Sequence, residues 1–219
     1  TAHKGIVRDV AQVFDFIERP FINTHFHHLL VAPNDMRQPL YQMINKEIRL
    51  ARAGKDAFIR LKLNHVVDEK MVAKLYEACT AGVRVELCLR GNCSLIPGVP
   101  GYSEGLFINA IISRYLEHSR IYIFGNDGEP KYYIGSTDWM TRNLDRRIEV
   151  MTPVYDPDIQ RELDFVISAG LRDTEQGYYT NGEEVRPRRE DIDDKTELFN
   201  SQQTLYQYYV AKKKEENHG

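Results

Sequence analysis

The chain has 219 residues, 42% of them hydrophobic, and carries a formal net charge of -3 at pH 7. A chain of this length can bury roughly two thirds or more of the surface that its unfolded form would expose, so one well-packed domain is expected. The small negative charge argues against a surface coated in positive charge for gripping duplex DNA, and any anion site must therefore be local.

Cysteine usage and hydropathy favour a cytoplasmic protein. Cys79, Cys88 and Cys93 are odd in number and lack the paired spacing of a zinc site or redox motif. No window approaches the ~20 apolar residues needed to cross a bilayer, and no signal-peptide pattern opens the chain. We expect reduced thiols and leave peripheral membrane association open. Because the chain begins at Thr1 without a methionine, we also expect a piece of a longer protein.

Helical and strand-like patterns alternate through the first half of the chain. Apolar residues at helical spacing predict a first helix that ends before Pro20, and further helices over residues 40–53 and 69–81. Short apolar runs predict strands over residues 28–32, 58–63 and 83–89. This order predicts an α/β fold in which parallel strands are joined by short crossovers.

The second half begins with a loop over residues 91–105, which carries two Pro-Gly turn signals. Residues 106–117 are predicted to be helical, with Ser103 as the N-cap. Strands are expected over residues 119–124, 131–134 and 147–154, the first two joined by a hairpin turn. A helix over residues 158–168, an irregular stretch over 170–194 and a docked helix over 196–212 are expected to follow.

Two parts are therefore expected. Residues 1–169 should form the α/β domain. Residues 170–219 should form an irregular segment and a C-terminal helix packed on it, with a disordered, charged tail from Lys212.

A histidine and an arginine share one side of a predicted strand. His118 and Arg120 stand at positions i and i+2, which point the same way in a strand. If the preceding helix ends at Glu117, its negative end would favour protonated imidazole, which suits a phosphate ligand beside an arginine. The alternative is a hydrogen-bonded structural histidine, which is the commoner role at such junctions.

Other polar side chains stand at predicted strand exits. Lys62 and Asn64 follow one strand, Arg90 ends another, and two such exits would converge on one site. Residues 135–143 follow a third strand and include Ser136, where the backbone could turn its amides toward an anion.

Three arginines then follow closely, namely Arg142, Arg146 and Arg147. Their guanidinium groups can pair bidentately with phosphate oxygens. The alternative is that three acidic neighbours, Asp138, Asp145 and Glu149, neutralise them in ordinary ion pairs, and for Arg146 this has at least equal weight.

The sequence offers no familiar metal or nucleotide motif. His25, His27 and His28 invite a metal interpretation, which we set aside because no carboxylate or cysteine completes a ligand set nearby. Nothing resembles a Walker loop, a Rossmann glycine fingerprint or a kinase catalytic loop. Any ATP chemistry would use another fold.

Four segments together resemble the last catalytic domain of the long bacterial polyphosphate kinases. They are LKLN at 61–64, LRGNCSLIPG at 89–98, YLEHSRIYIF at 115–124 and DWMTRNLDRRIEV at 138–150. The likeness runs from about Val10 to about Ile167 and resumes faintly near Leu205.

The resemblance implies a phospholipase D-like fold, with a mixed, largely parallel sheet flanked by helices and a C-terminal helical extension. The resemblance also implies that this chain is the second of two related domains, which face each other across a cleft. The family transfers the terminal phosphate of ATP reversibly to polyphosphate, through a phosphohistidine in the preceding catalytic domain. ATP, ADP and polyphosphate are then the expected ligands and nucleic acid is not. Mg²⁺ bound by ligands outside this chain and a homo-oligomeric full-length enzyme are also expected.

The same resemblance assigns roles to single residues. Arg90 and His118 fall on positions that contact the nucleotide phosphates, and Arg147 on one that lines the polyphosphate path. His118 would also act as proton donor or charge stabiliser opposite the phosphorylated histidine. Lys62, Asn64, Arg120, Ser136 and Arg142 are weaker candidates.

Two rival functions remain open. The phospholipase D pattern asks for His-x-Lys and an Asp after four residues, but Arg120 and Gly125 occupy those positions. These departures weaken a lipid or nucleic-acid phosphodiesterase and fit the kinase family. The other rival is a non-catalytic polyanion-binding module.

Overall fold

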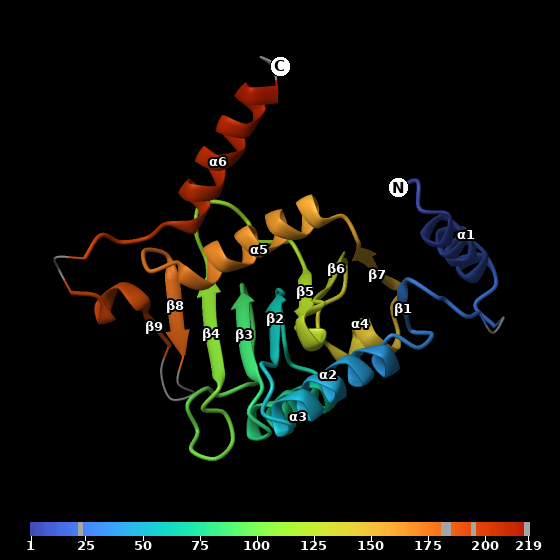
Figure 1. Cartoon of the computed structure of the whole chain (residues 1–219), viewed down its shortest axis with the longest axis horizontal. Coiled ribbons are helices and arrows are strands. Elements are labelled where there is room, and N and C mark those ends of the chain that lie inside the picture. The colour runs from blue at the N-terminus through green and yellow to red at the C-terminus, as the bar shows by residue number, and fades with distance from the viewer. Residues whose placement is uncertain (22–23, 181–184, 194–195, 217–219) are drawn as a thin grey trace.

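The computed structural model describes residues 1–21, 24–180, 185–193 and 196–216. Within these residues, nine strands form one sheet in the order β1-β7-β6-β5-β2-β3-β4-β8-β9 (Figure 1). The strands are β1 Leu30–Ala32, β2 Phe58–Lys62, β3 Arg84–Leu89, β4 Leu106–Ile111, β5 Ile121–Phe124, β6 Lys131–Gly135, β7 Glu149–Val154, β8 Gly177–Thr180 and β9 Val185–Pro187. The α-helices are α1 Lys4–Glu18, α2 Arg37–Arg52, α3 Glu69–Thr80, α4 Thr141–Asp145, α5 Pro157–Arg172 and α6 Ser201–Glu216.

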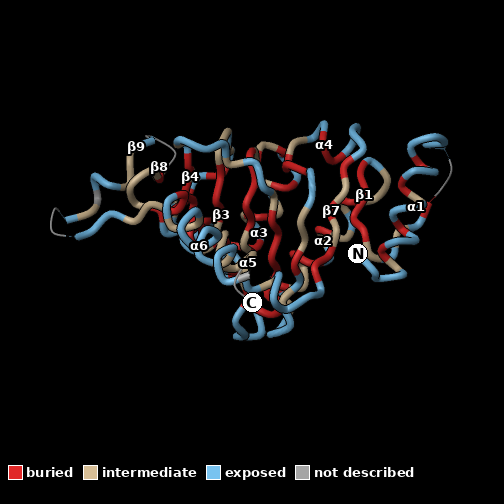
Figure 2. Tube along the Cα trace, turned by 90° about the horizontal axis from the view of Figure 1, so that it is seen from above, coloured by how far each residue is buried: buried red, intermediate tan, exposed pale blue. Residues whose placement is uncertain are grey.

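Helices cover both faces of the sheet. Residues of α2 and α3, among them Ile44 and Leu75, pack on one face in the larger core cluster. Ile167 and Leu171 of α5 pack on the other face. Because both faces are covered, the central strands are buried almost throughout, as Figure 2 shows. The α/β fold and the mixed sheet are confirmed.

The expectation of a largely parallel sheet is wrong. Only the pairs β2–β3 and β3–β4 are parallel among the described strands. The other pairs are antiparallel, including β2–β5, β5–β6 and β6–β7. Apolar strand patterns do not reveal direction, and the later strands follow one another through short connections that suit antiparallel pairing.

The helix expected over residues 106–117 is also wrong. Residues 106–111 form β4, and residues 112–120 connect it to β5 without helix or strand. Because β4 is buried on both faces, its apolar run resembles a buried helix in sequence. The Ser103 hydroxyl instead donates to the Ile96 carbonyl and accepts from the Val99 amide, which closes the preceding loop. The helix end that was expected at Glu117, next to His118, is therefore not formed.

The chain after α5 is more regular than its sequence indicates. β8 pairs with β4, and β9 pairs with β8, so this segment extends the sheet instead of wrapping irregularly over it. The buried Asn109 of β4 donates to the carbonyls of Gly170 and Asp173 at 2.7 and 3.0 Å, which fixes the turn into β8.

The terminal helix α6 forms as expected, and beyond its buried start it also contacts α5, where Tyr208 packs against Phe165. Ser201 and Gln202 are buried, whereas most of the residues that follow are exposed, and the helix points away from the sheet (Figure 1). It continues to Glu216, so the fraying expected from Lys212 is wrong up to that residue; Lys212 pairs with Glu162 of α5. Residues 217–219 lie outside the described part. None of the described helices could cross a membrane.

Candidate functional site

The polar candidates from four strands meet at one edge of the sheet. Asn64 and Arg90 follow β2 and β3, which are parallel. His118 precedes β5, which runs antiparallel to β2, and Asp138 follows β6, which runs antiparallel to β5. The predicted convergence of strand exits is confirmed. Isolated bridges from Val66 to the segments after β3 and β6 tie these exits together.

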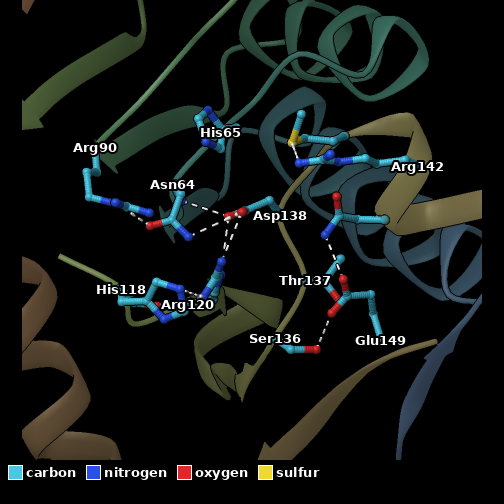
Figure 3. Close-up of polar contacts among 12 residues, drawn as sticks. Asn64, His65, Arg90, His118, Arg120, Ser136, Thr137, Asp138, Arg142 and Glu149 are labelled. Carbon is cyan, nitrogen blue, oxygen red and sulfur yellow. Dashed lines mark hydrogen bonds and ion pairs between the residues drawn. The ribbon is translucent and has the colours of Figure 1, made fainter. Parts of the chain in front are cut away.

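Asp138 links most of this edge through hydrogen bonds. Its carboxylate accepts hydrogen bonds from the backbone N–H of Asn64 at 2.8 Å and from the side-chain Nδ2 of Asn64 at 3.2 Å (Figure 3). It also accepts from Nε and Nη2 of Arg120, at 3.3 and 3.0 Å. The Asn64 side-chain oxygen in turn accepts from Nε of Arg90 at 2.8 Å. One carboxylate therefore orients two arginines, the second through an asparagine.

The carboxylate of Asp138 stays ionised although it is only 5% exposed. Burial alone would raise the pKa of Asp138, but the hydrogen bonds from Arg120 and Asn64 outweigh burial and hold that pKa below its usual value. The pair with Arg120 is nearly buried on both sides, at 11% and 7% side-chain exposure. Removing one partner of such a pair strongly destabilises the fold, because the other charge is left buried and unpaired.

His118 is exposed and held by Arg120. Nη1 of Arg120 lies 3.0 Å from Nδ1 and 3.2 Å from Nε2 of the imidazole, and it donates to the His118 carbonyl at 2.8 Å. A guanidinium can only donate, so the ring nitrogen that meets it must accept. In the neutral imidazole the other ring nitrogen then carries the hydrogen and is a donor.

Arg90 lines a cavity between β3 and the segment that carries His118. The cavity measures about 320 Å³ and is lined by Arg90 and residues 111–117, including Arg114. Nε of Arg90 is engaged by Asn64, whereas its two Nη groups have no hydrogen-bond partner among the described residues. Those groups can still form the paired donor geometry that phosphate oxygens accept.

The three arginines after β6 are not neutralised as the sequence alternative supposed. Asp138 pairs with Arg120, Asp145 pairs with Arg37, and Glu149 accepts from Asn143 and Ser136. The exposed side chains of Arg142, Arg146 and Arg147 make no ion pair within the described part of the chain. That alternative is wrong for all three, and a patch of positive charge results.

Lys62 and Ser136 lie close to the edge but face other partners. Lys62 is buried and donates to Glu117 at 2.5 Å. The Ser136 hydroxyl donates to Glu149, and the Ser136 amide donates to the Val150 carbonyl. The Trp139 amide donates to the His65 carbonyl, so these two amides of the segment after β6 do not face an anion.

Sequence reasoning missed three residues of this edge. His65 accepts from the Asn92 amide at 3.0 Å and lies beside Asn64 in Figure 3. Arg114 adds a further exposed cation to the cavity wall. From the sequence, Asp138 is predicted only to neutralise nearby arginines. Its position directly after the strand, next to the Gly-Ser pair, was the available signal.

The fold and its polar edge define an α/β domain with several guanidinium groups and the histidines His65 and His118 along one edge of its sheet. The family model of polyphosphate kinase C-terminal domain 2 matches residues 29–202. The chain belongs to this family, as the sequence resemblance predicted.

Individual relatives agree with this assignment. The polyphosphate kinase of Vibrio vulnificus (strain YJ016) is 45% identical over 174 residues, which are 80% of this chain and 25% of that protein. The polyphosphate kinase of Escherichia coli (strain K12) is 44% identical over 183 residues, 84% of this chain and 27% of that protein. The chain thus spans about a quarter of the length of these curated relatives.

A solved structure extends the match to nearly the whole chain. The crystal structure of polyphosphate kinase from Porphyromonas gingivalis matches with a TM-score of 0.90 and 33% sequence identity, covering 98% of this chain and 33% of that chain. The arrangement of strands and helices described above is therefore shared with a part of that longer protein.

Proposed function

We propose that this chain forms the phosphate-binding half of a polyphosphate kinase active site. In the whole enzyme, the terminal phosphate of ATP would pass reversibly to polyphosphate through a phosphohistidine in a preceding domain. The observation that carries the proposal is the row of guanidinium groups without ion pairs, together with the exposed His118, along a single edge of the sheet. Phosphoryl transfer depends on such positioned charge around the moving group more than on covalent chemistry.

Each residue takes a role that its surroundings allow. Arg90 and His118, which Asp138 links through Asn64 and Arg120, would contact the phosphates of the nucleotide. Arg147, with Arg142 beside it, would line the path of the polyphosphate chain. The surface position of His118 would let it act opposite the phosphorylated histidine, donating a proton or stabilising negative charge.

The described residues do not fit a magnesium site. The acidic side chains at this edge are already engaged, Asp138 by Arg120 and Glu117 by Lys62. No group of three His, Cys, Asp or Glu suited to a metal occurs in the described ranges. We therefore assign Mg²⁺, where the whole enzyme uses it, to ligands outside this chain. Assembly of the full-length enzyme into a homo-oligomer is likewise part of the proposal.

Labelling with ATP tests the division of labour between domains. After incubation with ATP labelled on its terminal phosphate, this chain alone should carry no acid-labile, base-stable phosphate. A longer protein that includes the preceding domain should carry it and, with Mg²⁺, should make a phosphate chain. Labelling of this chain at His118 would contradict the proposal, as would diester cleavage without any phosphate-chain product.

The arginine patch predicts salt-sensitive binding of polyphosphate. We expect the triple variant R142A/R146A/R147A of this chain to bind polyphosphate roughly 10-fold more weakly at low salt, because three uncompensated charges are removed. The measurement is fluorescence anisotropy of labelled polyphosphate at low and high salt. The affinity of the unmodified chain should fall steeply with salt, and that of the variant less so.

A matched control removes the same charge from the opposite edge of the sheet. Arg49, Arg52 and Lys131 are exposed there, and their triple alanine variant should keep most of the affinity. If the two triple variants lose the same affinity, polyphosphate binding depends on net charge alone. The arginine patch would then not be part of the binding site.

A further inference from the structure

His118 lies on a segment that has no regular structure of its own. Residues 112–120 connect β4 to β5 without helix or strand, so no ladder of backbone hydrogen bonds fixes them. The same segment forms a wall of the cavity beside Arg90. Its conformation must therefore depend on side-chain contacts with neighbouring elements.

The first contact is a buried ion pair one residue before His118. Nζ of Lys62, on β2, lies 2.5 Å from the carboxylate of Glu117, and the two side chains are only 5% and 16% exposed. Burial alone would lower the pKa of Lys62, but the Cys88 sulfur and Glu117 raise it above its usual value, so the ammonium persists. The pair also neutralises an acidic group that would otherwise stand among the phosphate-binding residues.

The second contact comes from the first turn of α6. Nε2 of Gln202 donates to Glu117 at 2.7 Å and to the Tyr115 carbonyl at 2.8 Å, and its oxygen accepts from the Tyr115 amide at 3.0 Å. Gln202 is itself buried, and Asp173 accepts from both the amide and the hydroxyl of the adjacent Ser201. The segment is thus held from both sides, by the sheet and by α6.

We infer that Lys62, Glu117 and Gln202 form a clamp that positions His118 for phosphoryl transfer, an inference that rests on the function proposed above. None of the three has to touch a substrate for this role. A buried ion pair is weak support for stability, because apolar residues of similar volume often replace one without loss. Its value here is geometric, since it fixes Glu117 and with it the backbone next to His118.

Kinetics of the full-length enzyme test the clamp. The variants K62M and Q202A should each lower kcat about 10- to 100-fold, because small displacements of a catalytic group have effects of this size. Their KM for ATP should change much less, within about 3-fold, since only the His118 contact is displaced while Arg90 and the arginine patch still hold the phosphates. The double variant K62M/E117Q removes both charges and the contact between them, so its kcat should stay as low as that of K62M, whereas a loss caused only by an unpaired buried charge would be relieved.

Two matched changes serve as controls. Lys55→Met breaks an exposed ion pair with Asp127 at the other end of the sheet, and Gln203→Ala alters the exposed neighbour of Gln202. Both should leave kcat at the level of the unmodified enzyme. Where K62M fails to fold, Q202A still decides the question, because Gln202 lies at the start of α6 and outside the sheet.

The outcomes separate this inference from the proposed function. A wild-type kcat in Q202A, or a lower melting temperature without a lower kcat, would overturn the clamp while His118→Ala still impairs turnover. Wild-type turnover in His118→Ala would overturn the proposed function itself. A loss of kcat in K62M and Q202A that persists in K62M/E117Q supports the inference, and recovery of kcat in K62M/E117Q would overturn it.

Discussion

Replacing His118 with alanine in the full-length enzyme is expected to lower turnover by roughly 10²- to 10⁴-fold, the usual contribution of a general acid or base. The fold should survive, because the side chain is exposed and its ring hydrogen-bonds only to Arg120 among the described residues. The measurement is steady-state synthesis of polyphosphate, with circular dichroism to confirm that the variant is folded.

The matched control for His118→Ala is His25→Ala, which removes an exposed histidine on the segment before β1. That variant should keep wild-type turnover. Near-wild-type turnover of His118→Ala would return His118 to the structural role that its position between β4 and β5 also permits. If His118 acts only after the histidine of the preceding domain has been phosphorylated, that phosphorylation should persist in His118→Ala.

Asp138→Asn should have the second large effect, on both stability and activity. The amide cannot balance the charge of the nearly buried Arg120, so we expect a loss of about 3 kcal/mol in the free energy of unfolding. Turnover should fall at least about 10²-fold, because Arg90 and Arg120 lose the carboxylate that orients them. Chemical denaturation of this chain measures the first effect, and kinetics of the full-length enzyme the second.

The pH dependence gives Asp138→Asn a distinct signature. The folded state holds the pKa of Asp138 below its usual value, so its ionised form stabilises the fold above about pH 4, and this contribution is lost as pH falls through the folded-state pKa. The gap in unfolding free energy between wild type and Asp138→Asn should therefore narrow below about pH 4. A gap that stays constant with pH would contradict the ion pair.

A neighbouring carboxylate provides the control for Asp138. Asp145 also pairs with an arginine, Arg37, but it is 39% exposed, so Asp145→Asn should cost less than about 1 kcal/mol. If both variants lose the same free energy of unfolding, the burial of Asp138 does not increase the contribution of its ion pair to stability.

The sequence predicted most elements of the fold, because their patterns were unambiguous. The helices over α2, α3 and α5 and the strands β2, β3, β5 and β6 lie close to the expected ranges. The failure at β4 has a physical cause. A strand buried on both faces shows no alternation, and its pattern cannot be distinguished from that of a buried helix. Strand direction was likewise invisible, since it depends on which strands pair.

The candidate site was predictable where strand order alone brings residues together. Asn64, Arg90 and His118 converge because they stand at strand ends that share one edge of the sheet. Whether the three arginines of the patch form ion pairs could not be predicted, because the acidic residues near them pair with residues far away in sequence. Asp145 forms an ion pair with Arg37, which lies 108 positions away in the sequence, and no local pattern reveals this pair. The clamp was missed for the same reason, since Gln202 lies 85 positions from Glu117.

The pairing of β8 with β4 bears on where this polypeptide can be divided. The two parts expected from the sequence share one sheet, since β8 hydrogen-bonds to β4 and the β4 side chain of Asn109 holds the turn after α5. A cleavage or fusion boundary placed between α5 and β8 would strip β4 of that neighbour. The bare strand edge would then offer unpaired amides and carbonyls to other molecules, the usual starting point for edge-to-edge aggregation.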